Sequence, residues 1–497
     1  MSGLSKTRIQ YHRQCPRRLW LQAYRPQLAE IDLAIQRQFD IGNRVGEIAR
    51  SFHPDGVLID VTERAQQLAD TAAALAGSPR PVFEATFEAD GVLVRADLLL
   101  PDAGGYRLVE VKSATTVKPH YLDDAAIQAW VMRKAGIPVT RVEVAVIDTS
   151  FTYRGDGDYA GLLKHVDVTV ATRGFESQIP GWVSAARDTL ASKEPLIDTG
   201  DQCQKPHRCP FFASCAPRRL AAERAHYPVE ILPHADELAI DLRLEGYDDM
   251  REVPLHRLKN PIHQRIQRAC ASGRYELSPE AQEEIRPQPY PRHYLDFETI
   301  NPAVPVWPST RPYQQIPFQW SCHVESKNGT VEHKAFLASG DGDPRRAFAE
   351  SLVEALGATG TIFVYNAGTE RSHMRHLALC FPDLAPALNA AIARIVDLLP
   401  IARQHYYHPD MRGSWSIKDV LPTIAPELAY DNLEVGDGTQ AMRVFAELMD
   451  PALPDARRSG LRESLLRYCE RDTLAMVKVA HFFENGVIRK PSTRIVE

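Results

Sequence analysis

The chain has 497 residues, of which 44% are hydrophobic and 25% are charged, and its formal net charge is −6. This length predicts two or three domains, and the negative charge argues against a generic coat protein for nucleic acid, although its distribution matters more than the sum. No apolar run approaches the ~18 residues of a transmembrane helix, and the N-terminus lacks the apolar centre of a signal peptide. We therefore expect a globular, cytoplasmic protein with no membrane partner.

The first 29 residues carry six Lys or Arg residues and no Asp or Glu, with aromatic residues between them. Arg13, Arg17 and Arg18 lie in this strip, near Tyr11 and Trp20. Cations beside aromatic rings suit a phosphate backbone and stacked bases, so the strip predicts nucleic-acid binding by these arginines. An ordinary solvated helix face is the alternative.

An α/β core is predicted in the first part of the chain. Alternating apolar residues predict four strands, and longer periodic segments predict three helices. The turn Asp90-Gly91 between two such strands is a strong hairpin signal. The expected strands are 81–90, 92–101, 106–114 and 141–148, and the expected helices are 40–52, 62–76 and about 120–135.

Asp97 and Glu110 lie on neighbouring predicted strands, and Lys112 follows Glu110 by two residues. Residues two apart in a strand point to the same face, so Glu110 and Lys112 project together. Two carboxylates from adjacent strands can hold Mg²⁺ or Mn²⁺, and the ammonium group can offset charge that develops on a phosphate. An exposed cross-strand ion pair is the alternative.

These residues resemble the PD-(D/E)XK core of RecB-like nucleases, in which Asp, Glu-x-Lys and a following helix with Gln recur. Here the motif is formed by Asp97, Glu110, Lys112 and Gln128. The resemblance implies a restriction-endonuclease-like domain in which Asp97 and Glu110 bind the metal. It also implies that Lys112 assists hydrolysis and that Gln128 belongs to the active site.

The resemblance is incomplete at two positions. Met132 stands where the family has a Tyr after the Gln, and Gly46 stands where a His is common. Glu47 or Glu84 is a candidate for the missing ligand.

Three cysteines, Cys203, Cys209 and Cys215, follow this core at intervals of six residues, and Cys15 precedes it. RecB-like nucleases of the AddAB and CRISPR-adaptation types carry an iron–sulfur cluster held by one cysteine before the core and three after it. The resemblance therefore implies a [4Fe–4S] cluster that ties the N-terminus to the end of the domain. Four thiolates also suit tetrahedral Zn²⁺, which is the rival assignment.

Two breaks in composition divide the chain into three segments. One break follows Cys215, and the other is the Pro-rich stretch 286–294. We predict domains over 1–225 and 289–497, joined by a helical connector over 226–288. A plain spacer is favoured for the connector over a helix-hairpin-helix element that grips DNA.

The last segment predicts strands at 293–300, 317–324, 332–337, 361–366 and 394–400, and a long helix at 460–483. Asp296 and Glu298 share one face of the first strand. Asp472 falls in the apolar stripe of the long helix, with Tyr468 one turn before it. A carboxylate that points inward is costly unless it is paired or bound to a metal.

This segment resembles the DEDD 3′–5′ exonucleases of the RNase H-like fold, which carry D-x-E, N-x₃-D and Y-x₃-D motifs. The resemblance implies two-metal hydrolysis of phosphodiester bonds, with a Tyr that orients the attacking water. Glu370 stands where the family has Asp, and Asn366 is expected to contact nucleic acid. The matching residues are Asp296, Glu298, Asn366, Glu370, Tyr468 and Asp472.

The sequence thus predicts a metal-dependent nuclease with two candidate sites, acting on single-stranded regions or ends of DNA. No phosphate-binding loop of the G-x-x-x-x-G-K-[ST] type is present, so the chain is not predicted to be an ATP-driven helicase. Two alternatives stay open: an iron–sulfur scaffold that binds nucleic acid with one or both sites inactive, and an exonuclease that acts on RNA.

Overall fold

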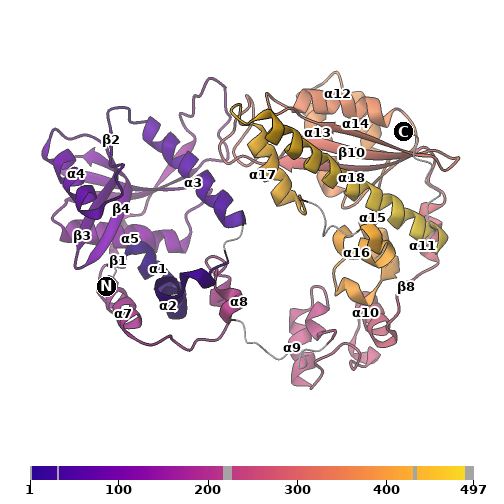
Figure 1. Ribbon diagram of the computed structural model, residues 1–497, viewed down its shortest axis with the longest axis horizontal. Helices are drawn as coiled ribbons and strands as arrows, with labels where there is room; N and C mark the ends of the chain where they lie inside the picture. The colour runs from indigo at the N-terminus through magenta and orange to yellow at the C-terminus, as the bar shows by residue number, and fades with distance from the viewer. Residues whose placement is uncertain (1–2, 31–32, 216–225, 429–433, 487–497) are drawn as a thin grey trace. The chain divides into compact units, whose positions relative to one another are not determined.

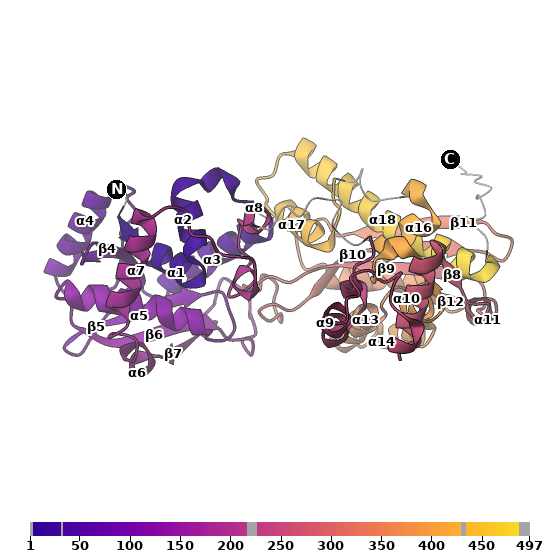
Figure 2. The ribbon, with the colours of Figure 1, turned by 90° about the horizontal axis from the view of Figure 1, so that it is seen from below.

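The computed structural model describes residues 3–30, 33–215, 226–428 and 434–486. The chain divides into two compact units (Figures 1 and 2). Unit 1 comprises Met1–Arg218 and Pro302–Gln314, and unit 2 comprises Arg219–Asn301 and Gln315–Glu497. Each unit combines helices with a sheet, which confirms the α/β class. The predicted domain boundary at residue 225 lies outside the described residues.

Unit 1 is built on a seven-stranded sheet with the order β2-β3-β4-β5-β6-β7, in which β1 also pairs with β4. The β3–β4 hairpin turns at Asp90 and Gly91, which both have positive φ, as the tightest hairpin turns require. The strands are β1 (Leu4–Ser5), β2 (Val57–Leu58), β3 (Val82–Ala89), β4 (Val92–Asp102), β5 (Gly105–Lys112), β6 (Val139–Ile147) and β7 (Leu163–Asp167).

Helix α5 (Pro119–Lys134) connects the parallel strands β5 and β6 and is buried from Asp124 to Met132. Its inward side chains therefore lie against the end of β5, where Glu110 and Lys112 are. The other helices of unit 1 are α1 (Lys6–Gln14), α2 (Pro16–Tyr24), α3 (Leu33–Ser51), α4 (Arg64–Ala76), α6 (Thr169–Arg173), α7 (Ile179–Ala191) and α8 (Phe212–Cys215).

The segment Pro302–Gln314, which follows β9 of unit 2 in the chain, belongs to unit 1. The Tyr153 N–H donates to the Thr310 carbonyl at 3.0 Å, and the Tyr153 carbonyl accepts a hydrogen bond of 2.8 Å from the Ser309 N–H. Ala303 and Val304 share an apolar cluster with residues of α3. Each unit therefore combines two separate stretches of sequence, whereas each predicted domain was one continuous stretch.

Unit 2 contains a five-stranded sheet with the order β11-β10-β9-β12-β13. Strands β9, β10 and β11 are antiparallel neighbours, whereas β12 and β13 run parallel to β9. The strands are β9 (Arg292–Ile300), β10 (Ile316–Glu325), β11 (Val331–Leu337), β12 (Thr361–Val364) and β13 (Ile395–Asp397), and a separate pair is β8 (Glu276–Leu277) with β14 (Tyr406–Tyr407).

Helix α18 (Asp455–Asn485) covers one face of this sheet, and α13 (Gly368–Cys380) and α14 (Ala385–Ile392) cover the other (Figure 2). Asp397 ends β13 and caps α15 (Leu398–His405), so the predicted strand over 394–400 is shorter than expected. The remaining helices are α9 (Asp236–Leu244), α10 (Pro261–Ser272), α11 (Glu280–Ile285), α12 (Arg345–Leu356), α16 (Ile417–Ile424) and α17 (Gly438–Leu448).

The connector shares a core with the C-terminal fold. Leu242, Met250 and Ile266 of the connector lie in one apolar cluster with Phe363 of β12 and Phe483 of α18. Burial of these side chains couples the connector to the sheet energetically. In the described residues, no helix combines the length and the apolar character that a membrane crossing needs.

Candidate active sites

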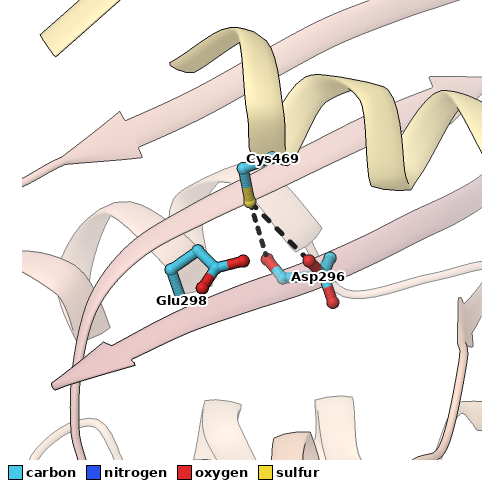
Figure 3. A group of neighbouring side chains, drawn as sticks. All are labelled: Asp296, Glu298 and Cys469. Carbon is cyan, nitrogen blue, oxygen red and sulfur yellow. Dashed lines mark hydrogen bonds between the residues drawn. The ribbon is translucent and has the colours of Figure 1, made fainter. Parts of the chain in front are cut away.

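The clearest acidic site lies on β9 in unit 2. Alternation along the strand buries Leu295 and Phe297 in the apolar cluster on one face and turns Asp296 and Glu298 to the other. Figure 3 shows these two carboxyl groups beneath Cys469 of α18. Ligand atoms from Asp296, Glu298 and Cys469 all lie within 4.8 Å of one another.

Two further carboxyl groups face this pair. Asp472 of α18 and Glu370 of α13 are both buried. Burial raises the pKa of Asp296 well above its usual range, and the charges of Asp472, Glu298 and Glu370 raise it further. Burial and the charge of Asp472 raise the pKa of Glu298 to about 8, although Lys418 opposes the shift. The four groups therefore repel one another when ionised.

Glu370 also has a buried carboxylate oxygen without a hydrogen-bond partner among the described residues. Burial raises the pKa of its carboxyl group to about 7, and its buried Oε2 has no hydrogen-bond partner in the described structure. A buried carboxylate oxygen without a partner is costly. A hard cation would satisfy this oxygen and offset the repulsion among the four groups.

Tyr468 lies one helical turn before Asp472 and is buried beside it. Burial raises the pKa of its hydroxyl group, as does the negative charge of Asp472. Lys418 Nζ donates to the Tyr468 oxygen at 3.2 Å and to the Gly436 carbonyl at 2.6 Å. The sequence analysis missed Lys418, which lies in the first turn of α16.

Asn366 is exposed, unlike the buried carboxyl groups of Glu298, Glu370 and Asp472. It is exposed at the turn between β12 and α13, with a φ of 75°, and its N–H donates to Asp397 Oδ1 at 2.9 Å. Its side chain lines a separate cavity, which is described below.

The second acidic site lies in unit 1 around Glu110, which is 1% exposed. Lys112 Nζ donates to Glu110 Oε1 at 2.6 Å, and Gln128 Nε2 of α5 donates to Glu110 Oε2. Asp97 Oδ2 accepts a hydrogen bond of 2.7 Å from the Val111 N–H. The structure thus brings together the four residues of the predicted PD-(D/E)XK motif.

Two residues that the sequence analysis did not assign to this site, Lys6 and Asp124, also belong to it. Lys6 Nζ lies 3.1 Å from Glu110 Oε1 and 3.1 Å from Asp124 Oδ1, and Lys112 Nζ donates to Asp124 Oδ2 at 2.8 Å. Asp124 precedes Gln128 by four residues, so both lie on one face of α5. That spacing was the signal in the sequence that could have identified Asp124.

The two ammonium groups set the charge balance of this site. Burial raises the pKa of Glu110 to about 7, with contributions from the charges of Asp124 and Asp97. Burial would also raise the pKa of Asp124, but Lys6 and Lys112 hold it below its usual range. Two lysines therefore offset much of the negative charge of three carboxyl groups.

Of the two candidates for the missing ligand, only Glu84 approaches Asp97. Glu84 and Asp97 lie opposite each other between the pairs Phe83–Leu98 and Ala85–Ala96, and Glu84 has a φ of 57°. The charge of Glu84 also contributes to the raised pKa of Asp97, after burial, the largest cause. Glu47 is exposed and pairs with Arg44 at 3.1 Å.

The four cysteines Cys15, Cys203, Cys209 and Cys215 line one small cavity in unit 1. Among the described residues, the one group of three candidate metal-ligand atoms within 4.8 Å is that at Asp296, so no three cysteine sulfurs lie that close together. Thiolates around a zinc ion, with Zn–S bonds of about 2.3 Å, would be about 3.8 Å apart. The four thiols thus converge on one cavity, and both the iron–sulfur cluster and its zinc rival stay predictions.

The arginines of the N-terminal strip are engaged inside unit 1. Arg13 pairs with Asp123 at 2.9 Å and lies over the Trp182 ring, while Arg17 pairs with Glu194 at 2.9 Å. The Arg18 guanidinium lies 4.3 Å from the centre of the Tyr11 ring. These contacts hold α1 and α2 against the rest of the unit, and nucleic-acid binding by these arginines stays a prediction.

The comparisons with known proteins name no activity. A sequence model of DUF2779, a domain of unknown function, matches residues 293–416. The uncharacterized protein UU173 of Ureaplasma parvum is 25% identical over 214 residues, which cover 38% of this chain and 31% of that protein. The uncharacterized MG366 homolog of Mycoplasma pneumoniae is 27% identical over 214 residues, with coverages of 39% and 32%.

The uncharacterized protein MG366 of Mycoplasma genitalium is similar to this chain at 22% identity over 211 residues, with coverages of 39% and 32%. The chain therefore spans less than a third of the length of each of these relatives. The matched domain begins at β9 and includes Asp296, Glu298 and Glu370.

The raised pKa values in unit 2 predict a pH-dependent stability. Glu298, with a pKa of about 8, and Glu370, with a pKa of about 7, both lie above the ordinary value of 4.5. Between pH 4.5 and pH 8, the folded protein therefore binds more protons than the unfolded chain. The stabilisation that these two protonated groups give the folded state is fully present below about pH 4.5 and is lost as the pH rises through 7 to 8. Each pKa unit corresponds to on the order of 1 kcal/mol.

We expect the Tm in EDTA to fall between pH 5 and pH 8.5, and Mn²⁺ to restore it most strongly at the higher pH, because the cation binds ionised carboxylates. Scanning calorimetry of the wild type and of Glu298→Gln measures both effects. The variant should show a smaller fall. An equal fall in the variant, or a Tm that Mn²⁺ leaves unchanged at pH 8.5, would contradict the assignment.

Proposed function

We propose that the chain is a metal-dependent nuclease that hydrolyses phosphodiester bonds of DNA, with a DEDD exonuclease site in unit 2. The observation that carries the proposal is a group of four carboxyl residues whose mutual repulsion a divalent cation would relieve: half-buried Asp296 and buried Glu298, Glu370 and Asp472. The mixed sheet with this pair on its central strand supports an RNase H-like fold for unit 2.

The residues present fit Mg²⁺ or Mn²⁺, because carboxylate oxygens are the ligands these hard cations prefer. Asp296, Glu298 and Asp472 would hold the ions, with Glu370 as a further ligand. When bound, the ions supply an activated water and stabilise the leaving 3′ oxygen. Cys469 is a soft ligand with a pKa raised by burial, so it packs against Asp296 rather than binding these ions.

Tyr468 is placed to orient a water molecule. Its oxygen already accepts a hydrogen bond from Lys418, so the hydroxyl proton is left to be donated elsewhere. Burial keeps the hydroxyl neutral, since it raises its pKa. Tyr468 therefore acts as a hydrogen-bond donor to the attacking water or to the phosphate, and Lys418 fixes its orientation.

Unit 1 supplies the second proposed site, a PD-(D/E)XK centre in which Asp97 and Glu110 bind the metal and Lys112 assists hydrolysis. The crossover helix α5 and the antiparallel β4–β5 pair support this fold for unit 1. One observation favours the alternative of a nucleic-acid-binding unit without cleavage. Both oxygens of Glu110 already accept hydrogen bonds from Lys6, so a cation must displace this ammonium group.

The four convergent cysteines are proposed to hold a [4Fe–4S] cluster with a structural role. Gln14 Nε2 donates to the carbonyls of Gln202 and His207 at 2.7 Å each, so α1 and the cysteine loop are already joined beside the site. The proposed location is the cytoplasm, where cysteine thiols stay reduced.

Single and double variants separate the two catalytic sites. Asp296→Asn removes a metal ligand of unit 2, and we expect it to lower Mn²⁺-dependent degradation of 3′-labelled single-stranded DNA by at least about 100-fold. Lys112→Ala tests unit 1, and Asp341→Asn, at an exposed position of unit 2, is the matched control. RNA of the same sequence, assayed in parallel, tests the alternative substrate.

Undiminished degradation by the double variant Asp296→Asn with Lys112→Ala would overturn the nuclease proposal. Loss of activity in Lys112→Ala alone, with Asp296→Asn unaffected, would move the activity to unit 1.

The cluster is tested by metal content. Protein purified without oxygen should be brown and hold about four iron and four sulfide ions per chain, and Cys15→Ser should lose the colour and most of the iron. Cys380→Ser, which changes a cysteine outside the cavity, is the control. A colourless protein with one zinc ion per chain would refute the iron–sulfur assignment.

A further inference from the structure

Unit 2 contains a cavity of about 660 Å³ beside the turn between β12 and α13. Its lining includes His234 and Asn260 of the connector, Asn366 of the turn, Arg403 of α15 and the segment 413–417. Small-molecule sites in proteins typically have volumes of roughly 300–1,000 Å³. The cavity is thus large enough for a ligand, and its wall depends on the packing of the connector against the C-terminal fold.

The charge of this lining favours an anion. Arg403 is exposed and forms no ion pair within the described part of the chain. None of the described residues that line the cavity is acidic, although the whole chain has a net charge of −6. Two carboxylates lie beside the lining: Asp397 accepts hydrogen bonds from the N–H groups of Asn366, Ala367 and Leu399, and Asp419 accepts one from Ser414 Oγ.

Three helices contribute their first turns or caps to the same wall. Asn260 caps α10, Leu399 lies in the first turn of α15, and Ser416 caps α16. The partial positive charge at helix N-termini favours anions such as phosphate. Because α15 is capped by the Asp397 carboxylate and α16 has Asp419 in its first turn, Arg403 is the group of this lining that best suits a phosphate.

The rest of the lining suits an aromatic ring with polar edges. Half-buried Tyr365 supplies aromatic surface, and its hydroxyl donates at 2.6 Å to the carbonyl of Trp415, which is only 4% exposed. The exposed amide of Asn366 can donate and accept hydrogen bonds. A ligand that combines phosphate with a heteroaromatic ring matches this mixture.

We propose that this cavity binds a nucleotide, with the phosphate near Arg403 and the base against Tyr365. Asn366 precedes the site residue Glu370 by four residues on the same turn and helix. The inference rests on the proposed function to the extent that the nucleotide belongs to the substrate strand. A free nucleotide presents the same chemistry, so the test compares both sources.

Isothermal titration in EDTA tests the cavity without hydrolysis. The ligands are AMP, dAMP, a single-stranded DNA tetranucleotide and inorganic phosphate, and the variants are Arg403→Gln and the control Arg286→Gln, an exposed arginine outside the lining. We expect Arg403→Gln to weaken nucleotide binding about tenfold, as loss of a charge-assisted hydrogen bond does. The control should bind as the wild type does, and both variants should keep its Tm.

Tighter binding of the tetranucleotide than of the mononucleotides would identify the ligand as part of a strand. Equal binding would identify a free nucleotide, and either result supports the proposal. It would be overturned by the absence of binding, by inorganic phosphate binding as tightly as AMP, or by Arg403→Gln binding like the wild type. The titration contains no metal, so it measures binding without hydrolysis. Nucleotide binding by a protein that shows no activity in the degradation assay would refute the nuclease proposal and leave the cavity proposal standing.

Discussion

Repulsion among buried carboxyl groups is the constraint on which the arrangement of unit 2 depends. Strand β9 fixes Asp296 and Glu298 on one face because its other face is packed in the apolar core. Helices α13 and α18 then bring Glu370 and Asp472 to the same place. Because the charges of Asp472, Glu298 and Glu370 raise the pKa of Asp296, protons or cations would stabilise the group.

In unit 1, lysine side chains of the protein itself offset the repulsion among the carboxyl groups. Its three carboxyl groups at Asp97, Glu110 and Asp124 face the ammonium groups of Lys6 and Lys112. In unit 2, Lys418 is directed to Tyr468 and the Gly436 carbonyl, and only partly opposes the raised pKa of Glu298. An external cation would therefore relieve more repulsion in unit 2, and this is the reason that the proposed nuclease activity is assigned mainly to unit 2.

Local patterns predicted much of this structure. The Asp90-Gly91 turn fixed the β3–β4 hairpin, and the spacing of Asp296 with Glu298 placed both on one strand face. The apolar stripe of the long helix predicted α18 and the inward position of Asp472. In each case a short-range rule, either turn chemistry or side-chain periodicity, determines the outcome.

Long-range pairings were not predictable in the same way. Lys6 was assigned only to a basic strip, since its contact with Glu110 bridges 104 residues of sequence. The end of β13 was set too late because the capping role of Asp397 overrides the apolar pattern that continues after it. The cavity at Arg403 depends on packing between the connector and α15, which no periodicity indicates.

Crystals grown with Mn²⁺ and measured for anomalous scattering would test the central assignment most directly. We expect a manganese peak bound by the carboxylates of Asp296 and Glu298, and we expect Asp296→Asn crystals to lack it. A wild-type map without manganese at these residues, with the carboxyl groups hydrogen-bonded to one another or to a protein cation, would contradict the assignment of this cluster as a metal site.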